Sequence, residues 1–284
     1  MERICVLGAG TMGAGIAQTC SQAGYKVIMR DLTEELVEAG YERIRTPLER
    51  RVRKGKMTQN EVEEIIGHIH GTVDLEEAVK DADLVIEAIF ENMEVKKELY
   101  REIDRLCRPE VVFATNTSSL SVTEMAAATS RADRFLGMHF FNPAPVMKLI
   151  ELIRGSETSD DTMTLARELS HRLGKEPVVV KESPGFVVNR LLVPMMNEAF
   201  NLLMEGTASA EDIDKAMKLG TNMPMGPFEL ADFTGLDVGL AVMEVLHRET
   251  GDPKFRPSPL LRQYVRAGRL GRKAGRGVYD YRSA

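Results

Sequence analysis

Tryptophan is absent from this sequence, and cysteine is scarce, with three cysteines and no CxxC pair. Isolated cysteines of this kind are expected to be reduced, buried thiols. The net charge of -6 argues against bulk binding to nucleic acid or to a membrane surface. No apolar run approaches the ~20 residues that a membrane-spanning helix needs. A strand is expected by residue 4, which leaves no room for a signal peptide, so we expect a cytoplasmic protein.

The rest of the composition is typical of a globular protein with a sizeable core. The chain has 284 residues, of which 43% are hydrophobic and 28% charged, which indicates one or two domains. Up to Ser183, apolar strands alternate with helical patterns, which predicts a Rossmann-type α/β domain with a mostly parallel sheet. No convincing strand follows. We therefore predict a Rossmann-type domain at 1–183 and an all-helical C-terminal domain at 184–284.

A dinucleotide-binding motif opens the chain. The apolar strand Arg3–Leu7 leads directly into a GxGxxG sequence, GAGTMG, and a helical pattern follows. In the dinucleotide fold, Gly8 makes the tight turn, Gly10 lets the backbone approach the pyrophosphate, and Gly13 lets helix and strand pack closely. Because strand, glycines and helix occur together, we predict a cofactor-binding loop. Its residues are Gly8, Gly10, Thr11, Met12 and Gly13.

The second predicted strand, Lys26–Arg30, is followed by an acidic residue that bears on the choice of cofactor. Asp31 lies at the distance from the glycines where a carboxylate accepts the hydroxyls of the adenosine ribose. A carboxylate there repels a 2′-phosphate, which favours NAD over NADP. Arg30 is the opposing feature, since an arginine nearby can accommodate that phosphate. In a strand, however, neighbouring side chains point to opposite faces.

The stretch GMHFFNPAPVMKLIELI, residues 137–153, contains the most suggestive pair of side chains. It begins as a strand with His139 near its end, turns after Asn142, and continues as a second strand that carries Glu151. A strand–turn–strand path brings Glu151 back toward His139, and a histidine oriented by a carboxylate is a usual dehydrogenase acid/base. Taken alone, the stretch also fits a partly buried His139 that caps a strand, with Glu151 on a solvated face.

The long helix predicted over residues 34–56 ends in a strongly basic segment. Arg50 and Lys54 within it are four residues apart and share a helix face. One hypothesis is a binding site for a phosphorylated substrate tail. The other is a solvated face whose cations are stabilised by the carboxyl end of the helix dipole.

Two further polar positions are candidates for ligand contacts. Ser118 follows the predicted strand Val111–Thr115, at the edge where open α/β sheets bind ligands. Asn189 lies in the predicted helix Phe186–Glu205, which is apolar nearly all round. A buried amide must find partners, so Asn189 is satisfied within the core or contacts the substrate. Such a helix in a domain of about a hundred residues also predicts burial against a second subunit, hence a homodimer through the helical domain.

Seven segments then occur in a fixed order along the chain. They are GAGTMGAGIAQ, the acid at Asp31, VIEAIFEN, NTSSLSVTE, HFFNPAPVMKLIE, SPGFVVNR and LGRKAGRGVYDY. Together they resemble the L-3-hydroxyacyl-CoA dehydrogenases over almost the whole chain, and most of all the bacterial 3-hydroxybutyryl-CoA branch of that family. The resemblance implies NAD-dependent interconversion of an L-3-hydroxyacyl-CoA, such as 3-hydroxybutyryl-CoA, and the 3-ketoacyl-CoA. It implies an acyl-CoA thioester substrate and no metal.

The resemblance also implies roles for single residues. His139 matches the catalytic histidine, Glu151 the glutamate that pairs with it, Ser118 a serine near nicotinamide and substrate, and Asn189 an asparagine that contacts the substrate. The positions that match further cofactor contacts are Glu91, Lys96, Asn142 and Lys273. The positions that match contacts to the coenzyme A phosphates are Arg50 and Lys54.

Two other interpretations remain open at this point. One is a dehydrogenase that acts on a free 3-hydroxy acid, although such relatives generally rely on a catalytic lysine in the helical domain. The other is a catalytically silent dinucleotide-binding protein, such as the lens crystallins that derive from this family. The His139–Glu151 pair and the basic helix favour a coenzyme A thioester over a free acid. The intact set of Ser118, His139, Glu151 and Asn189 argues against lost activity.

Overall fold

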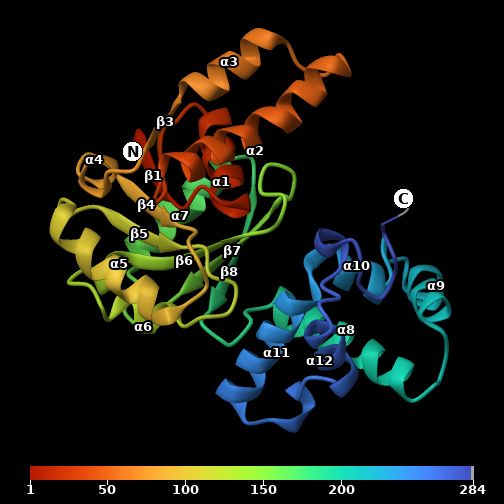
Figure 1. Ribbon diagram of the computed structural model, residues 1–284. Coiled ribbons are helices and arrows are strands. Elements are labelled where there is room, and N and C mark those ends of the chain that lie inside the picture. The colour runs from red at the N-terminus through yellow and green to blue at the C-terminus, as the bar shows by residue number, and fades with distance from the viewer. Residues whose placement is uncertain (283–284) are drawn as a thin grey trace. The chain divides into compact units, whose positions relative to one another are not determined.

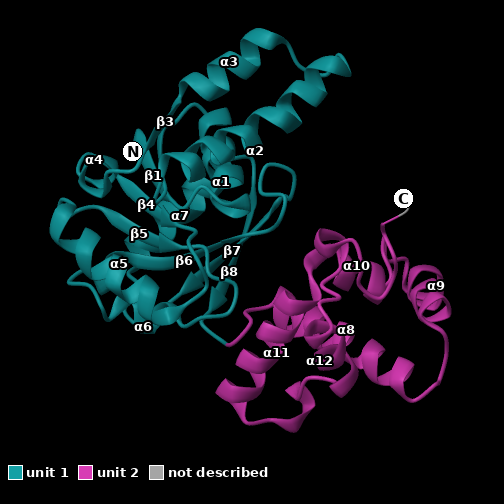
Figure 2. Ribbon diagram, viewed as in Figure 1, with its two compact units in different colours: residues 1–183 teal, residues 184–284 magenta. Residues whose placement is uncertain are grey.

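The computed structural model describes residues 1–282 (Figure 1). The chain divides into two compact units, residues 1–183 (unit 1) and residues 184–284 (unit 2), which Figure 2 distinguishes by colour. Each unit has its own hydrophobic core and is described by itself.

Unit 1 is built on an eight-stranded sheet with the order β3-β2-β1-β4-β5-β6-β7-β8. All neighbouring strands are parallel except β6 and β7, which are antiparallel. The prediction of a mostly parallel, Rossmann-type sheet is therefore confirmed. The strands are β1 Arg3–Leu7, β2 Lys26–Arg30, β3 Ile69–Thr72, β4 Leu84–Glu87, β5 Val112–Thr115, β6 Phe135–Phe140, β7 Leu149–Arg154 and β8 Glu176–Lys181.

Helices pack against this sheet, and apolar residues on both sides of each contact form the core. Ile16 of α1, for example, joins Val6 of β1 and Met29 of β2 in one buried cluster. Figure 1 shows α2 and α3 as a pair of helices that extends beyond the sheet. The helices of unit 1 are α1 Thr11–Gln22, α2 Glu34–Arg53, α3 Gln59–Gly67, α4 Leu75–Val79, α5 Met93–Leu106, α6 Val122–Ala126, the 3-10 helix η1 Ala132–Arg134 and α7 Asp160–Arg172.

Two local features of unit 1 differ from expectation. Strand β3 was not predicted, because its sequence IHGT contains one apolar residue and a glycine. That glycine, Gly71, is pressed against Val37 and Tyr41 of α2, where a β-carbon would lie 2.5 Å from the valine side chain. Helix α2 ends at Arg53, three residues earlier than predicted, and Gly55 just beyond it has a φ of +64°.

Unit 2 contains no strand among its described residues, apart from two isolated bridges near the C-terminus. The all-helical prediction for this part of the chain is confirmed. Its core is formed by apolar residues from α8, α10 and α11, including Phe200, Phe228 and Met243. The helices are α8 Val188–Met204, α9 Ala210–Thr221, α10 Pro227–Thr234, α11 Leu236–Thr250, η2 Pro253–Phe255, α12 Pro259–Arg266 and η3 Arg272–Ala274.

The C-terminal tail is held onto unit 2 by two buried aspartates. Asp214 accepts a hydrogen bond from the Tyr279 hydroxyl at 2.8 Å, and Asp232 accepts one from the Tyr281 hydroxyl at 3.1 Å. Asp232 also accepts the backbone N–H groups of Val278 and Tyr279. Tyr279 and Tyr281 therefore anchor the tail on unit 2. Burial raises the pKa of Asp214.

No helix in residues 1–282 combines the length and apolarity needed to span a bilayer.

Candidate functional site

The glycine loop lies between the end of β1 and the start of α1, and its geometry explains the glycines. Gly8 has a φ of +103°, and a β-carbon there would lie 2.5 Å from the carbonyl oxygen of Ala88. A β-carbon on Gly13 would lie 1.8 Å from the carbonyl oxygen of Gly8. By contrast, a β-carbon on Gly10 would meet nothing within 4 Å. Two glycines are therefore needed for internal packing, while Gly10 leaves backbone exposed where an anion can meet the helix N-terminus.

Asp31 lies beside this loop because β2 is the parallel neighbour of β1. One of its carboxylate oxygens accepts the Ala9 N–H and the other accepts the Leu32 N–H, each at 2.7 Å. These two bonds fix the carboxylate next to the glycine loop. The Arg30 side chain is used elsewhere, since its Nε donates to the Val73 carbonyl at 3.1 Å.

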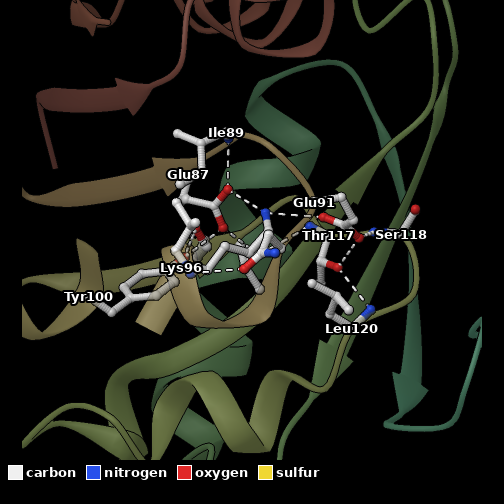
Figure 3. A network of polar contacts seen from close by, with 12 residues as sticks. Glu87, Ile89, Glu91, Lys96, Tyr100, Thr117, Ser118 and Leu120 are labelled. Atoms are coloured by element: carbon white, nitrogen blue, oxygen red, sulfur yellow. Dashed lines mark hydrogen bonds and ion pairs between the residues drawn. The ribbon is translucent and has the colours of Figure 1, made fainter. Parts of the chain in front are cut away.

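The next two strands contribute a network of polar contacts (Figure 3). Lys96 of α5 is 1% exposed, and its ammonium lies 2.5 Å from Glu87 at the end of β4 and 3.1 Å from Glu91. Glu91 in turn accepts the Thr117 hydroxyl at 2.5 Å and the Ser118 N–H at 3.1 Å. The structure therefore brings three sequence-predicted residues, Glu91, Lys96 and Ser118, into one group.

The antiparallel pairing of β6 and β7 places His139 directly opposite Glu151. The Nδ1 atom of His139 lies 2.8 Å from a carboxylate oxygen of Glu151, and the two residues are 6% and 1% exposed. The alternative with Glu151 on a solvated face is therefore wrong. The carboxylate accepts the Nδ1–H, which leaves Nε2 as the basic nitrogen of the neutral ring.

The turn between these strands is held by Lys175, which the sequence did not predict, and by Asn116. Lys175, just before β8, is 5% exposed and donates to the carbonyl oxygens of Ala144 at 2.6 Å and Met147 at 2.7 Å. Burial lowers the pKa of this lysine. Asn116 accepts the Phe140 N–H at 2.9 Å and so fixes the end of β6. No local pattern indicates Lys175, because its partners lie some 30 residues away in the sequence.

The same turn forms one wall of a cavity of about 830 Å³ in unit 1. Helix α2 forms another wall of the cavity, with residues that include Arg43, Pro47 and Arg51. Arg50, in the last turn of the same helix, and Lys54, just after its end, are exposed but do not line the cavity. Arg43 also donates to the Ala9 carbonyl at 3.3 Å, so α2 connects the cavity with the glycine loop.

Two predicted residues belong to unit 2. Asn189 is half-buried in the first turn of α8. Lys273 forms an ion pair with Asp237 at 2.7 Å. The roles of both residues stay predictions.

Comparison with known proteins agrees with this geometry. The family described as "3-hydroxyacyl-CoA dehydrogenase, NAD binding domain" matches residues 3–183, and its C-terminal domain matches residues 185–281. The chain belongs to the 3-hydroxyacyl-CoA dehydrogenase family. It is 53% identical to a probable 3-hydroxybutyryl-CoA dehydrogenase of Bacillus subtilis, over 99% of this chain and 98% of that protein. The mitochondrial hydroxyacyl-coenzyme A dehydrogenase of Homo sapiens is 44% identical, over 99% of this chain and 92% of that protein.

A solved structure supports the same assignment. The (S)-3-hydroxybutyryl-CoA dehydrogenase of Ralstonia eutropha superposes with a TM-score of 0.94 at 52% identity, covering 99% of both chains. Membership of the family makes NAD the cofactor of unit 1. The residues present fit it, because the open backbone at Gly10 and the carboxylate of Asp31 are the two features that the pyrophosphate and the adenosine ribose require.

We predict that Asp31→Ala weakens NADH binding by roughly 10- to 100-fold, since a charge-assisted hydrogen bond to the ribose is lost. Discrimination against NADPH should relax, because the repulsion of the 2′-phosphate disappears. Fluorescence titration with both cofactors measures the two effects. Asp31→Asn is the matched control, since it removes the charge but keeps an oxygen for Ala9, and it should lose less NADH affinity. A wild-type protein that prefers NADPH would contradict the assignment.

Proposed function

We propose that this chain catalyses the NAD-dependent interconversion of L-3-hydroxyacyl-CoA and 3-ketoacyl-CoA, with 3-hydroxybutyryl-CoA and acetoacetyl-CoA as the main pair. The observation that carries the proposal is the buried hydrogen bond between His139 and Glu151. The names of the relatives support the acyl group, since 3-hydroxybutyryl-CoA dehydrogenases of Bacillus subtilis and Clostridioides difficile are 53% and 48% identical to this chain.

His139 acts as the general base in the oxidative direction. Its Nε2 takes the proton of the 3-hydroxyl group. NAD, held by the glycine loop and Asp31, would supply the hydride acceptor for C3. Glu151 holds the Nδ1–H, which fixes the tautomer and stabilises the imidazolium that forms. In the reductive direction, the protonated ring of His139 returns the proton to the 3-keto oxygen.

Ser118 and Asn189 bind the substrate in this proposal. Both carry groups that hydrogen-bond to a hydroxyl, a keto oxygen or a thioester carbonyl. Ser118 lies next to Glu91 and Lys96, which supports a position on the nicotinamide side. Asn142, on the turn beyond His139, is assigned to the same side. Lys273, in the tail of unit 2, is proposed to contact the cofactor.

The coenzyme A group of the substrate is proposed to lie against α2. The cavity beside this helix offers apolar walls at Pro47, Ala144 and Val146 for the pantetheine arm. Arg50, in the last turn of this helix, and Lys54, just after its end, present two exposed cations to the phosphates. The basic helix is the observation that favours a coenzyme A thioester over a free 3-hydroxy acid. Oxidation of NADH by acetoacetyl-CoA, followed by absorbance, distinguishes this proposal from a free-acid enzyme and from a silent binding protein.

We predict that His139→Gln lowers kcat by roughly 10²- to 10⁴-fold, the range for loss of general acid–base help. NADH binding should persist. Glu151→Gln keeps the size of the side chain but removes the charge, and it should also lower kcat. Because residues that act as a unit are non-additive, the double variant should be scarcely slower than His139→Gln alone.

A matched control exists on the surface of unit 1, where the exposed His70 lies 3.1 Å from Glu77. His70→Gln breaks a similar pair and should leave kcat unchanged. Losses that multiply in the His139 and Glu151 double variant would show that the two residues contribute independently.

We predict that Arg50→Ala and Lys54→Ala raise KM for acetoacetyl-CoA while KM for NADH changes little. The effect should shrink as salt is added, since contacts between exposed charges are screened. Arg45→Ala removes an exposed arginine from another face of α2 and serves as the control. Equal KM values for the wild type and the double variant would return both residues to the solvated-face hypothesis.

We propose further that the chain forms a homodimer through unit 2. Leu191 and Met204 of α8 are 71% and 49% exposed within a single chain, and Leu219 of α9 is 78% exposed. Burying such residues against a second copy removes apolar surface from water.

Sedimentation at micromolar concentration should therefore give twice the chain mass of 31.6 kDa. Leu191→Glu should favour the monomer, whereas Val179→Glu, at a residue of unit 1 that is 46% exposed, should not. A stable wild-type monomer would contradict this proposal.

A further inference from the structure

Glu87 is a buried carboxylate that the proposed reaction does not use. It ends β4, between β1 and β5, and its exposed fraction is 0%. One carboxylate oxygen accepts the Ile89 N–H at 2.8 Å and the Lys96 ammonium at 2.5 Å. The other accepts the Thr115 hydroxyl at 2.8 Å. A buried charge with this many donors is strongly fixed in position.

The Tyr100 ring completes the surroundings of Glu87. Its hydroxyl lies 3.4 Å from the second carboxylate oxygen and 3.2 Å from the Ala114 carbonyl. Burial and the charge of Glu87 raise the pKa of Tyr100, so the phenol stays a donor. Thus α5 contributes a cation and a phenol, and β5 contributes a hydroxyl, to a single carboxylate.

Lys96 transmits this fixed position to the loop that carries Ser118. Its ammonium also contacts Glu91, whose side chain is 36% exposed. Glu91 holds the Thr117 hydroxyl and the Ser118 N–H, as Figure 3 shows. A lysine stem is long and flexible, so without a second, buried anion its ammonium has freedom to follow Glu91. Glu87 supplies that anion.

We infer that Glu87 is a positioning residue for the nicotinamide half of the cofactor site, acting through Lys96 and Glu91. The inference rests on the proposed cofactor roles of Lys96, Glu91 and Ser118. It assigns Glu87 no contact with the cofactor or with the substrate. The opposing explanation is that the Glu87–Lys96 pair only stabilises the fold, as a buried ion pair in any part of the sheet would.

Glu87→Gln is the decisive substitution. It preserves the shape of the side chain but leaves one acceptor oxygen where the carboxylate had two, and its amide donors face other donors. We expect the ammonium of Lys96 to shift toward Glu91. Glu91 should then lose its hydrogen bonds to the Thr117 hydroxyl and the Ser118 N–H. The Kd for NADH should rise roughly 10- to 100-fold, the loss expected when a charge-assisted contact is misplaced. The Kd for 5′-ADP, which probes the Asp31 half of the site, should stay within about twofold of the wild-type value.

Two controls separate positioning from stability. Asp104→Asn breaks another ion pair of unit 1, between the half-buried Asp104 and the buried Arg131 at 2.6 Å, and should lower Tm without raising the Kd for NADH. Glu94→Gln makes the same substitution as the test variant in a surface pair with Lys97 and should change neither quantity. If Glu87→Gln does not fold, Glu87→Asp keeps the charge, withdraws it from Lys96 by one methylene and should raise the Kd for NADH in the same direction.

Failure of the Glu87 inference can be distinguished from failure of the proposed function. A folded Glu87→Gln protein with wild-type affinity for NADH would overturn the inference, as would equal losses for NADH and 5′-ADP. A wild-type protein that binds NADH but does not reduce acetoacetyl-CoA would overturn the proposed substrate, while the binding comparison would still decide the role of Glu87.

Discussion

The hydrogen bond between His139 and Glu151 depends on the one antiparallel pairing of the sheet. The two residues are only 12 positions apart, and a parallel neighbour would need a crossover of a dozen or more residues between the strands themselves. Reversing β7 instead puts the residues opposite each other across the β6–β7 register. Both side chains are buried, so loss of this bond would leave a polar group of the interior with one hydrogen bond fewer. The turn that permits the reversal must therefore be held firmly, and Lys175 and Asn116 bind its two sides.

The buried charges of unit 1 likewise need partners that satisfy them in the interior. Glu87 with Lys96, Asp104 with Arg131, and Lys175 with two carbonyls each place a charge where burial is costly. Replacing a buried ion pair by apolar residues is often neutral or stabilising, so such pairs are weak evidence for stability alone. Glu87 and Lys175 adjoin the residues proposed to bind cofactor and substrate, whereas the Asp104–Arg131 pair links α5 to the segment after α6. Proximity to the site thus distinguishes Glu87 and Lys175 from the Asp104–Arg131 pair.

The sequence was informative where a function needs a local pattern. The glycine loop, Asp31 and the alternation of strands and helices can each be recognised from residues that are close together in the sequence. The structure places them as expected. A strand–turn–strand pattern also predicted that His139 and Glu151 lie close to each other. Glu87 and Lys175 could not be found this way, because their partners come from other elements and only the folded sheet unites them. Strand β3 was missed for a related reason, since packing of Gly71 against α2, rather than β-propensity, holds it in place.

Parallel strands explain why so many unrelated side chains meet at one edge of the sheet. The carboxyl ends of β2, β1, β4 and β5 lie in this order at the same edge. Asp31, Gly8, Glu87 and the Thr117–Ser118 loop therefore follow one another in space, although they are spread over the first 118 residues. Strand β6 runs in the same direction, and His139 lies near its end. Each position on this edge is fixed by a neighbour: Asp31 by the Ala9 N–H, Glu91 by Lys96, His139 by Glu151. A hydride can pass only between centres held in one geometry. The buried polar contacts behind the edge are therefore best understood as the means by which a sheet of short strands keeps that geometry.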